Sequence, residues 1–208
     1  MATDGGTGDR VVVWDLGNVL IPWDRHGAML AATGSDEAAR QLSETVFTLE
    51  VNEHIDRGAS PRKVNEIVER QHPGHGWVVD AYVEHFHHSL GSLIEGSARL
   101  LDEVRHSGHR CVGLSNWGRI TFEGIPEMYP ALGKLEGVLI SGEVGITKPD
   151  PSIYEHCEQH FGFTAAQATF IDDSTANVAA ALARGWDAIR FTDPGQLRVA
   201  LADRNLIA

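Results

Sequence analysis

Arg10-Val-Val-Val-Trp-Asp15-Leu-Gly-Asn-Val-Leu20 is the stretch that decides the fold. Its apolar residues lead directly into one carboxylate, that of Asp15, and a glycine and a second apolar pair follow. An unbroken apolar run is typical of a strand that is buried on both faces, as in parallel sheets. Such a strand delivers its last polar residue to the carboxyl edge of the sheet, where α/β proteins bind ligands. Asp15 is therefore a candidate catalytic carboxylate, although this segment alone is more typical of a turn that ends a strand.

Length and charge limit the function classes that need to be considered. The 208 residues are enough for one domain of good size, or for a core with a smaller insert. The formal net charge of -12 argues against nucleic acid and against an anionic membrane as partners, because phosphate backbones and anionic lipids bind basic surfaces. A small phosphorylated substrate remains compatible with this charge, since local donors and a metal ion can reverse the potential inside one cleft.

The cysteines and the N-terminal segment indicate a cytoplasmic protein. Cys111 and Cys157 are too few for a disulfide framework or for a Cys-rich zinc site, and they fit a reduced compartment. Residues 1–9 are Gly-rich and polar, lack the apolar core of a signal peptide, and are expected to form a disordered tail. No apolar run approaches the ~20 residues that a membrane span needs. We expect a monomer or a homodimer.

Residues 23–93 are expected to form a helical insert. Gly34 is a plausible end of the first helix, and a second helix is expected from Ser35 to Gly58. Ser60-Pro61 supplies an N-cap and a first-turn proline for a third helix, and His72-Pro73-Gly74 separates it from a fourth. Four helices are too many for one crossover between neighbouring strands, so this segment is an inserted cap.

Helices and strands alternate regularly from residue 94 onward. Strands are expected at 110–114, 137–140, 168–171 and 188–191, each separated from the next by a helical pattern. This alternation is typical of βαβ units and a parallel sheet. The predicted fold class is therefore α/β, with a Rossmann-like parallel sheet that has helices on both faces. Residues 10–22 and 94–208 would form this core domain, and the four-helix cap of residues 23–93 would interrupt it.

Polar residues follow the strands at the points where they end. Asp15 ends the first strand, Ser115-Asn116 the second and Asp172-Asp173 the fourth, while Lys148 follows the third. Because the carboxyl ends of parallel strands lie on one edge of a sheet, these side chains should converge. Clustered carboxylates repel one another unless a cation lies between them, and Mg²⁺ prefers such hard oxygen ligands. A hydroxyl group, amides and a lysine at the same point suit a phosphoryl group in transfer, and an aspartate there can act as the nucleophile.

Four segments resemble the four motifs of haloacid dehalogenase-like hydrolases. They are Asp15-Leu-Gly-Asn-Val-Leu, Leu114-Ser115-Asn116, Lys148-Pro149 and Phe170-Ile-Asp172-Asp173-Ser. The resemblance covers nearly the whole chain, since the insert is similar to the four-helix cap of the first class in this family. With Asp56-Arg-Gly58 in the cap, the chain is most similar to bacterial sugar-1-phosphate phosphatases and to the phosphatase domain of epoxide hydrolases.

The resemblance implies a magnesium site. Asp15 would be both the nucleophile and a Mg²⁺ ligand, and Gly17 would give its backbone carbonyl to the metal. Asp173 would bind the metal directly, and Asp172 would be either a ligand or a partner of the ligands. Asn177, one helical turn further on, would orient this acidic loop.

The resemblance also implies a phosphoryl site. Ser115 and the Asn116 amide would bind the phosphoryl oxygens, and Lys148 would neutralise the nucleophile and the transferring group. Candidates for contacts with the substrate lie in the cap, and they are Trp23, Asp24, His54 and Arg57. A core role is as plausible for Trp23.

Gly17 departs from the family pattern. Most phosphatases of the family place a second aspartate two residues after the nucleophile, as the general acid and then the base. A missing proton donor typically lowers the rate by about 10²–10⁴. Three explanations compete: a leaving group that needs little protonation, such as an anomeric sugar phosphate; another donor, such as Asp24, His26 or a water; or loss of hydrolysis with binding retained.

The sequence thus predicts a Mg²⁺-dependent phosphatase for a small phosphorylated metabolite, with a sugar phosphate as one candidate. Carbon–halogen hydrolysis by Asp15 is the first alternative, because Ser115-Asn116 resembles the dehalogenase pattern as well. Dehalogenases of this kind need no metal, so the adjacent carboxylates of Asp172 and Asp173 argue against it. A catalytically impaired binding or regulatory protein is the second alternative, which Gly17 motivates.

Overall fold

A five-stranded parallel sheet forms the centre of the fold. The computed structural model describes residues 10–208, so the tail expected at residues 1–9 lies outside the described part. The strand order is β3-β2-β1-β4-β5, and every neighbouring pair is parallel. The strands are β1 (Val11–Trp14), β2 (Arg110–Ser115), β3 (Val138–Ile140), β4 (Ala168–Asp172) and β5 (Asp187–Arg190). The α/β fold class expected from the sequence is confirmed.

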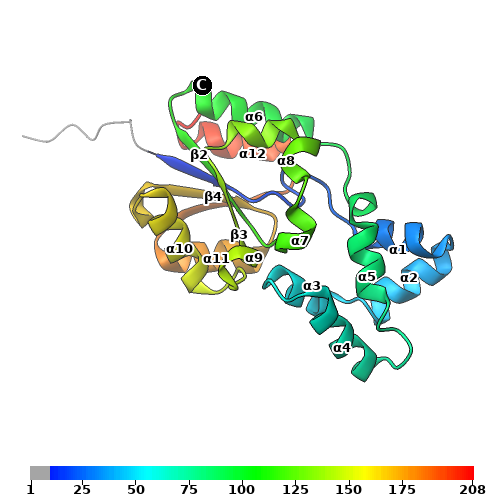
Figure 1. The fold of residues 1–208 in the computed structure, drawn as a ribbon. Coiled ribbons are helices and arrows are strands. Elements are labelled where there is room, and N and C mark those ends of the chain that lie inside the picture. Colours follow the sequence, from blue (N-terminus) through cyan, green and yellow to red (C-terminus); the bar gives the residue numbers. More distant parts are fainter. Residues whose placement is uncertain (1–9) are drawn as a thin grey trace, which may run out of the picture.

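Helices cover both faces of this sheet, which explains why β1 is apolar throughout (Figure 1). Alternate side chains of a strand point to opposite faces. Val12 and Trp14 pack in one buried cluster, and Val11 and Val13 pack in another. The first face is covered by α6 (Glu95–His106) and α12 (Pro194–Ala202), and the second by α10 (Pro151–Phe161) and α11 (Thr175–Arg184).

Short helical segments complete the connections of the core. They are α7 (Arg119–Phe122), α8 (Ile125–Met128), η2 (Pro130–Lys134), α9 (Ser141–Val144) and η3 (Ala165–Gln167). In residues 10–208, no helix combines the length and the apolar character needed to cross a membrane.

The insert contains five α-helices, not the expected four. They are α1 (Arg25–Thr33), α2 (Asp36–Thr45), α3 (Leu49–Asp56), α4 (Pro61–Gln71) and α5 (Val78–Glu84), followed by the 3-10 helix η1 (Phe86–Ser89). The single helix expected from residue 35 to residue 58 is divided. Thr48 has an extended backbone, and its hydroxyl oxygen accepts a hydrogen bond from the Val51 N–H, so it begins a new helix. The Phe47 side chain is buried in the cap, where the centroid of its ring lies 4.2 Å from that of the Tyr82 ring.

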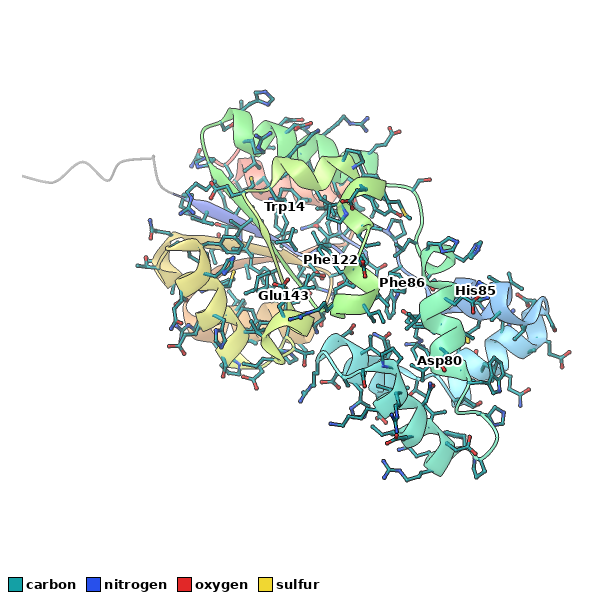
Figure 2. The ribbon with its side chains drawn as sticks, viewed as in Figure 1. Trp14, Asp80, His85, Phe86, Phe122 and Glu143 are labelled. Carbon is teal, nitrogen blue, oxygen red and sulfur yellow. The ribbon has the colours of Figure 1, made fainter. Side chains whose placement is uncertain are left out.

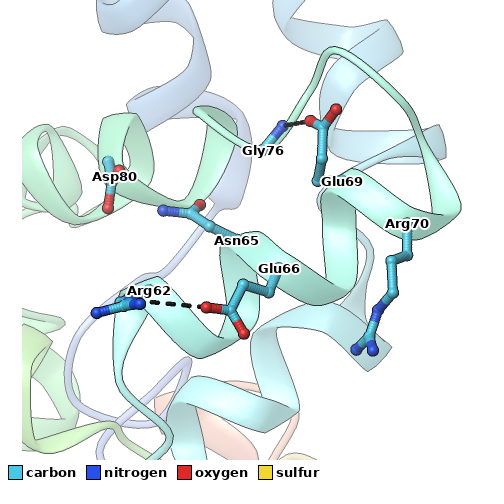
Figure 3. A pocket seen from close by; sticks show the side chains of 7 residues that line it. All are labelled: Arg62, Asn65, Glu66, Glu69, Arg70, Gly76 and Asp80. Carbon is cyan, nitrogen blue, oxygen red and sulfur yellow. Dashed lines mark hydrogen bonds and ion pairs between the residues drawn. The ribbon is translucent and has the colours of Figure 1, made fainter.

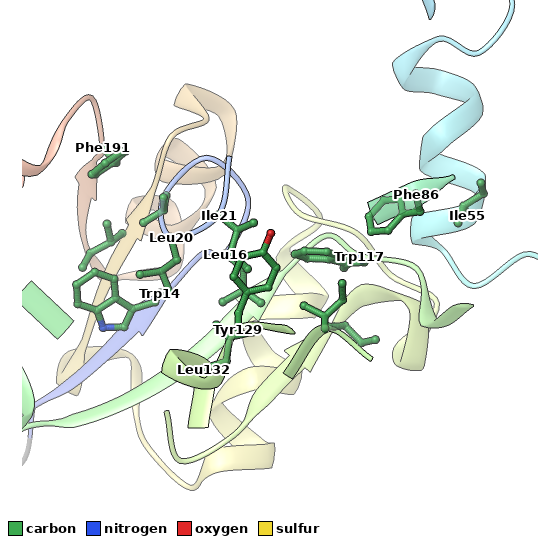
Figure 4. Close-up of a cluster of buried hydrophobic side chains, with 14 of the residues drawn as sticks. Trp14, Leu16, Leu20, Ile21, Ile55, Phe86, Trp117, Tyr129, Leu132 and Phe191 are labelled. Carbon is green, nitrogen blue, oxygen red and sulfur yellow. The ribbon is translucent and has the colours of Figure 1, made fainter. Parts of the chain in front are cut away.

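The cap packs against the core through aromatic rings and through close backbone contacts. Phe86 of the cap and Phe122 of the core lie where the two parts meet (Figure 2). The centroid of the Trp117 ring lies 5.8 Å from that of Phe86 and 5.5 Å from that of Phe122. Ile55 and Phe86 belong to the same buried cluster as Trp14 and Leu16 of the core (Figure 4). One hydrophobic cluster therefore extends from the sheet into the cap.

The C-terminal end of α3 is the part of the cap that lies closest to the core backbone. Ser141 Oγ donates a hydrogen bond to the carbonyl oxygen of Asp56 at 2.6 Å. A Cβ atom on Gly118 would lie 2.6 Å from Ile55 Cγ2, and one on Gly58 would lie 2.7 Å from the Gly142 carbonyl oxygen. Glycines thus permit a contact that side chains would prevent, and this contact fixes α3 above the carboxyl edge of the sheet.

Candidate active site

A cavity between the cap and the carboxyl edge of the sheet gathers most of the predicted site residues. Its volume is about 500 Å³. The predicted residues that line it are Asp15, Gly17, Trp23, Ser115, Asn116, Lys148 and Asp173. Asp172 lies fully buried behind this lining. Asp24 does not line the cavity; its exposed carboxylate caps α1 by accepting a hydrogen bond from the His26 N–H.

Asp15 follows β1 directly and is buried. Its Oδ1 accepts hydrogen bonds from the Leu16 N–H at 2.7 Å and from Ser115 Oγ at 2.9 Å, and Lys148 Nζ lies 2.9 Å from the same oxygen. Among the described residues, none donates to Oδ2, so this oxygen remains available to a metal ion or to an electrophile. Burial raises the pKa of Asp15 to about 7, against the attraction of Lys148 and with the repulsion of Asp172.

Lys148 is a fully buried cation with three oxygen partners. Besides Asp15 Oδ1, its Nζ lies 2.7 Å from Asp172 Oδ2 and donates to the Leu114 carbonyl oxygen at 2.9 Å. Burial alone would lower the pKa of Lys148, but the attraction of Asp15 and Asp172 outweighs it and raises the pKa. The ammonium group is therefore charged at neutral pH and fixed beside Asp15, where it can stabilise further negative charge.

Asp172 is fully occupied as a hydrogen-bond acceptor. Its Oδ1 accepts from the Ser174 N–H at 2.8 Å, and Asn177 Nδ2 lies 3.0 Å and 3.1 Å from its two carboxylate oxygens. Together with Lys148, these donors leave Asp172 a positioning role at the centre of the site. Asn177 thus contacts the acidic loop that it was expected to orient.

Asn116 is bonded to the backbone of Lys148 in both directions. Its Nδ2 donates to the Lys148 carbonyl oxygen at 2.9 Å, and its Oδ1 accepts from the Lys148 N–H at 2.8 Å. The sequence placed Asn116 in contact with the phosphoryl group through its amide. The structure shows that the side-chain amide holds the lysine loop against β2.

Three carboxylates form a possible metal site. One oxygen from each of Asp15, Asp172 and Asp173 lies within 4.8 Å of the other two. Asn18 Nδ2 donates to Asp173 Oδ2 at 3.4 Å, and burial, with the nearby Asp172, raises the pKa of Asp173. Hard oxygens grouped in this way fit a divalent cation such as Mg²⁺, which would offset their repulsion.

The cap contributes a wall that the sequence did not assign. Asn52, Glu53 and Asp56 of α3 line the cavity, as do the aromatic rings of Tyr82 and Phe86. Trp23 Nε1 donates to the Tyr82 hydroxyl oxygen at 3.1 Å, which fixes the Trp23 ring at the cavity edge. Asp56-Arg-Gly58 was part of the family resemblance, so a signal for this wall was present. The candidates expected in this part of the cap, His54 and Arg57, do not line the cavity.

Gly17 lies in open space. A Cβ atom placed there would have no neighbouring heavy atom within 4 Å, and the residue lines the cavity. The lack of a carboxylate at this position is therefore not imposed by crowding.

A second hollow on the outer surface of the cap has a different character (Figure 3). Three of its charged side chains have partners on the cap itself: Arg62 lies 3.4 Å from Glu66, and Glu69 accepts the Gly76 N–H at 2.9 Å. This hollow is larger, at about 640 Å³, but it contains neither the strand-end residues nor the carboxylate cluster. The candidate catalytic and metal-binding groups therefore lie in and behind the cavity at the sheet edge.

Similar proteins share this architecture. A sesquiterpene phosphatase of Aspergillus oryzae is 24% identical over 186 residues, which cover 88% of this chain and 90% of that protein. A HAD family enzyme from Bacteroides thetaiotaomicron, solved in complex with magnesium and inorganic phosphate, superposes with a TM-score of 0.71 at 21% identity and covers 89% of this chain and 96% of its own.

An L-2-haloacid dehalogenase from Xanthobacter autotrophicus has the same fold. Its TM-score is 0.62 at 17% identity, over 96% of this chain and 85% of its own. At such identities the two structural likenesses establish the fold alone. The sequence itself matches the family of haloacid dehalogenase-like hydrolases over residues 10–185, which is most of its length. This chain belongs to the haloacid dehalogenase-like hydrolases.

Proposed function

We propose that this chain is a Mg²⁺-dependent phosphatase that hydrolyses a small phosphorylated metabolite through an aspartyl-phosphate on Asp15. The observation that carries the proposal is the arrangement around Asp15. Ser115 and Lys148 hold one of its oxygens at 2.9 Å, while the carboxylates of Asp172 and Asp173 lie beside it. A nucleophile, a cation and a metal site in one cavity are the parts that phosphoryl transfer needs.

The residues fit a magnesium ion. Asp15 and Asp173 would hold it with the backbone carbonyl of Gly17, while Asp172, whose oxygens already accept four hydrogen bonds or ion-pair contacts, would support the site through Lys148. When bound, the ion supplies positive charge that offsets the carboxylates and the phosphoryl oxygens.

The protein groups then have distinct tasks. An Asp15 oxygen attacks phosphorus, and the bond from phosphorus to the ester oxygen breaks. Ser115 Oγ and the backbone N–H of Asn116 would bind phosphoryl oxygens, and Lys148 would stabilise the charge that develops on them. Water then releases phosphate from Asp15.

The cavity walls bear on the substrate class. Apolar and aromatic side chains line the cavity: Trp23, Leu49, Tyr82 and Phe86 from the cap and Trp117 from the core. Aromatic faces suit a sugar ring, and they equally suit an apolar leaving group of the kind that a sesquiterpene phosphatase handles. We propose a phosphate monoester whose organic part has an extended apolar face.

Phosphate release tests this proposal. The wild type should release phosphate from p-nitrophenyl phosphate and from members of a panel of sugar phosphates and isoprenoid phosphates, and EDTA should abolish the release. Asp15→Asn should abolish it too, because the amide cannot form the aspartyl-phosphate. Unchanged turnover in Asp15→Asn would contradict the assignment of the nucleophile.

Carbon–halogen hydrolysis is the alternative that the dehalogenase-like fold keeps open. It predicts that the protein releases halide from a 2-haloacid and that EDTA does not abolish this release. A third outcome, binding of phosphate esters without turnover over long incubation, would indicate a regulatory protein. In that case Gly17→Asp should create activity.

A further inference from the structure

We propose that Asp56, on cap helix α3, is the acid that protonates the leaving group and then the base that activates water, in place of the carboxylate that is missing at Gly17. This inference rests on the proposed function and assigns a residue of the cap to the same reaction.

Asp56 contributes to the reaction cavity from its cap side. It is the last residue of α3 and lines the same cavity as Asp15, Ser115 and Lys148. Asn52 Nδ2 donates to Asp56 Oδ2 at 2.8 Å, and the backbone N–H of Gly118 donates to the carboxylate. Donors from both the cap and the core thus fix this carboxyl group in position.

The surroundings of Asp56 suit proton transfer near neutral pH. Burial raises the pKa of Asp56 to about 7; the Gly118 N–H lowers it and nearby Glu53 raises it, and Lys148 makes a smaller opposing contribution. On α5, burial raises the pKa of the Tyr82 hydroxyl, and the negative charge of Asp56 raises it further. A general acid is most effective when its pKa lies near the working pH, because both protonation states are then populated.

Other candidate donors are occupied elsewhere. Asp24 caps α1 outside the cavity, and His26 Nε2 lies 2.9 Å from Asp36. Glu53 lines the cavity, but it is exposed, pairs with Arg57 at 2.7 Å and accepts from Thr147 Oγ1. Asp56 is therefore the carboxyl group of the cap wall best placed to reach a leaving group.

The proton balance of the two steps is complete. As an Asp15 oxygen bonds to phosphorus, the ester bond breaks, its electron pair stays on the ester oxygen, and the Asp56 proton transfers to that oxygen. In the second step a water oxygen bonds to phosphorus, its proton returns to the Asp56 carboxylate, and the bond between phosphorus and Asp15 breaks.

Asp56→Asn separates these steps when p-nitrophenyl phosphate is the substrate. p-Nitrophenolate leaves without protonation, so the variant should release one equivalent in a burst close to the wild-type rate. Turnover after the burst should fall by about 10²–10⁴, because no base activates water. Glu50→Gln makes the same chemical change at an exposed position of α3 and should leave turnover unchanged. Asp56→Glu, which keeps the carboxyl group, should retain more turnover than Asp56→Asn.

Gly17→Asp provides a rescue. In the Asp56→Asn background, a carboxyl group at the open position 17 should restore turnover by roughly tenfold or more. Unchanged turnover in Asp56→Asn would overturn the inference. Loss of the burst in Asp56→Asn would overturn it as well, provided that this variant unfolds at the same temperature as the wild type and is therefore folded. Absence of turnover in the wild type overturns the proposed function as well, whereas a functioning wild type with an indifferent Asp56 overturns this inference alone.

Discussion

The carboxyl group of Asp56 should leave a signature in stability as well as in catalysis. Its pKa is about 7 in the folded protein and near 4 in an unfolded chain. Between these values the folded state binds the extra proton, so this group makes the free energy of unfolding fall as pH rises. The free energy of unfolding of Asp56→Asn, taken relative to that of the wild type, should therefore rise by about 2 kcal/mol as the pH increases from 5 to 8.

Urea unfolding of both proteins across this pH range measures the difference, in which the contributions of titrating groups that do not interact with Asp56 cancel. Glu50→Gln should run parallel to the wild type. If Asp56→Asn also runs parallel to the wild type, Asp56 titrates normally and is a poor candidate for proton transfer at neutral pH.

Single residues also show what sequence could predict about the site. Asp15 and Asp173 directly follow strands, Ser115 ends β2, and Lys148 lies in the connection after β3. Their convergence at one edge of the parallel sheet therefore followed from the strand pattern. The partners of a side chain do not follow from such a pattern. The bonds from Asn116 to the Lys148 backbone, and the placement of Asp56 across the cavity, depend on how distant segments pack.

Helix α3 is the element of the cap that supplies Asp56 to the cavity. Gly58, which follows it, determines how closely the helix approaches the core. Gly58 has a φ of 80°, and a Cβ atom there would lie 2.7 Å from the Gly142 carbonyl oxygen. An alanine in the left-handed backbone region costs ~1–2 kcal/mol. Gly58→Ala should lower the free energy of unfolding by more than this amount, because its Cβ atom would also clash with the core. It should also reduce turnover, because α3 and Asp56 must move away from the core.

Gly34→Ala is the matched control for this prediction. Gly34 has a φ of 66°, yet a Cβ atom there would have no heavy atom within 4 Å. This variant should show only the backbone cost, by urea unfolding, and full turnover of p-nitrophenyl phosphate. Equal losses of stability and equal turnover in the two variants would show that the contact between Gly58 and Gly142 is unimportant.

The elements of the core followed from the sequence better than those of the cap. Apolar strands and intervening helices fixed the sheet, because buried parallel strands have a distinctive composition. In the cap, the apolar spacing from residue 35 to residue 58 favoured one helix, and the break at Thr48 was missed. A threonine inside a helical pattern is a common residue, and its capping role became visible only with the Val51 hydrogen bond.

For the whole molecule, the carboxylate cluster predicts that magnesium stabilises the fold. Oxygens of Asp15, Asp172 and Asp173 lie within 4.8 Å of one another. Folding brings Asp15, which follows β1, next to Asp172 and Asp173 at the end of β4. A ligand that binds only the folded state, at about 100 times its dissociation constant, adds about 2.7 kcal/mol. For a chain of this length that corresponds to a rise of about 5–10 °C in the thermal unfolding midpoint.

Thermal unfolding in increasing MgCl₂, at constant ionic strength, measures this rise. Asp173→Asn should reduce the response, since it removes a ligand at the cavity surface. Asp36→Asn, which changes an exposed carboxylate of the cap, should keep it. Because carbon–halogen hydrolysis needs no metal, a midpoint that is indifferent to magnesium and to EDTA would count against the phosphatase and in favour of the dehalogenase alternative. If magnesium stabilises the wild type but not Asp173→Asn, the metal binds in the cavity where Asp15 lies.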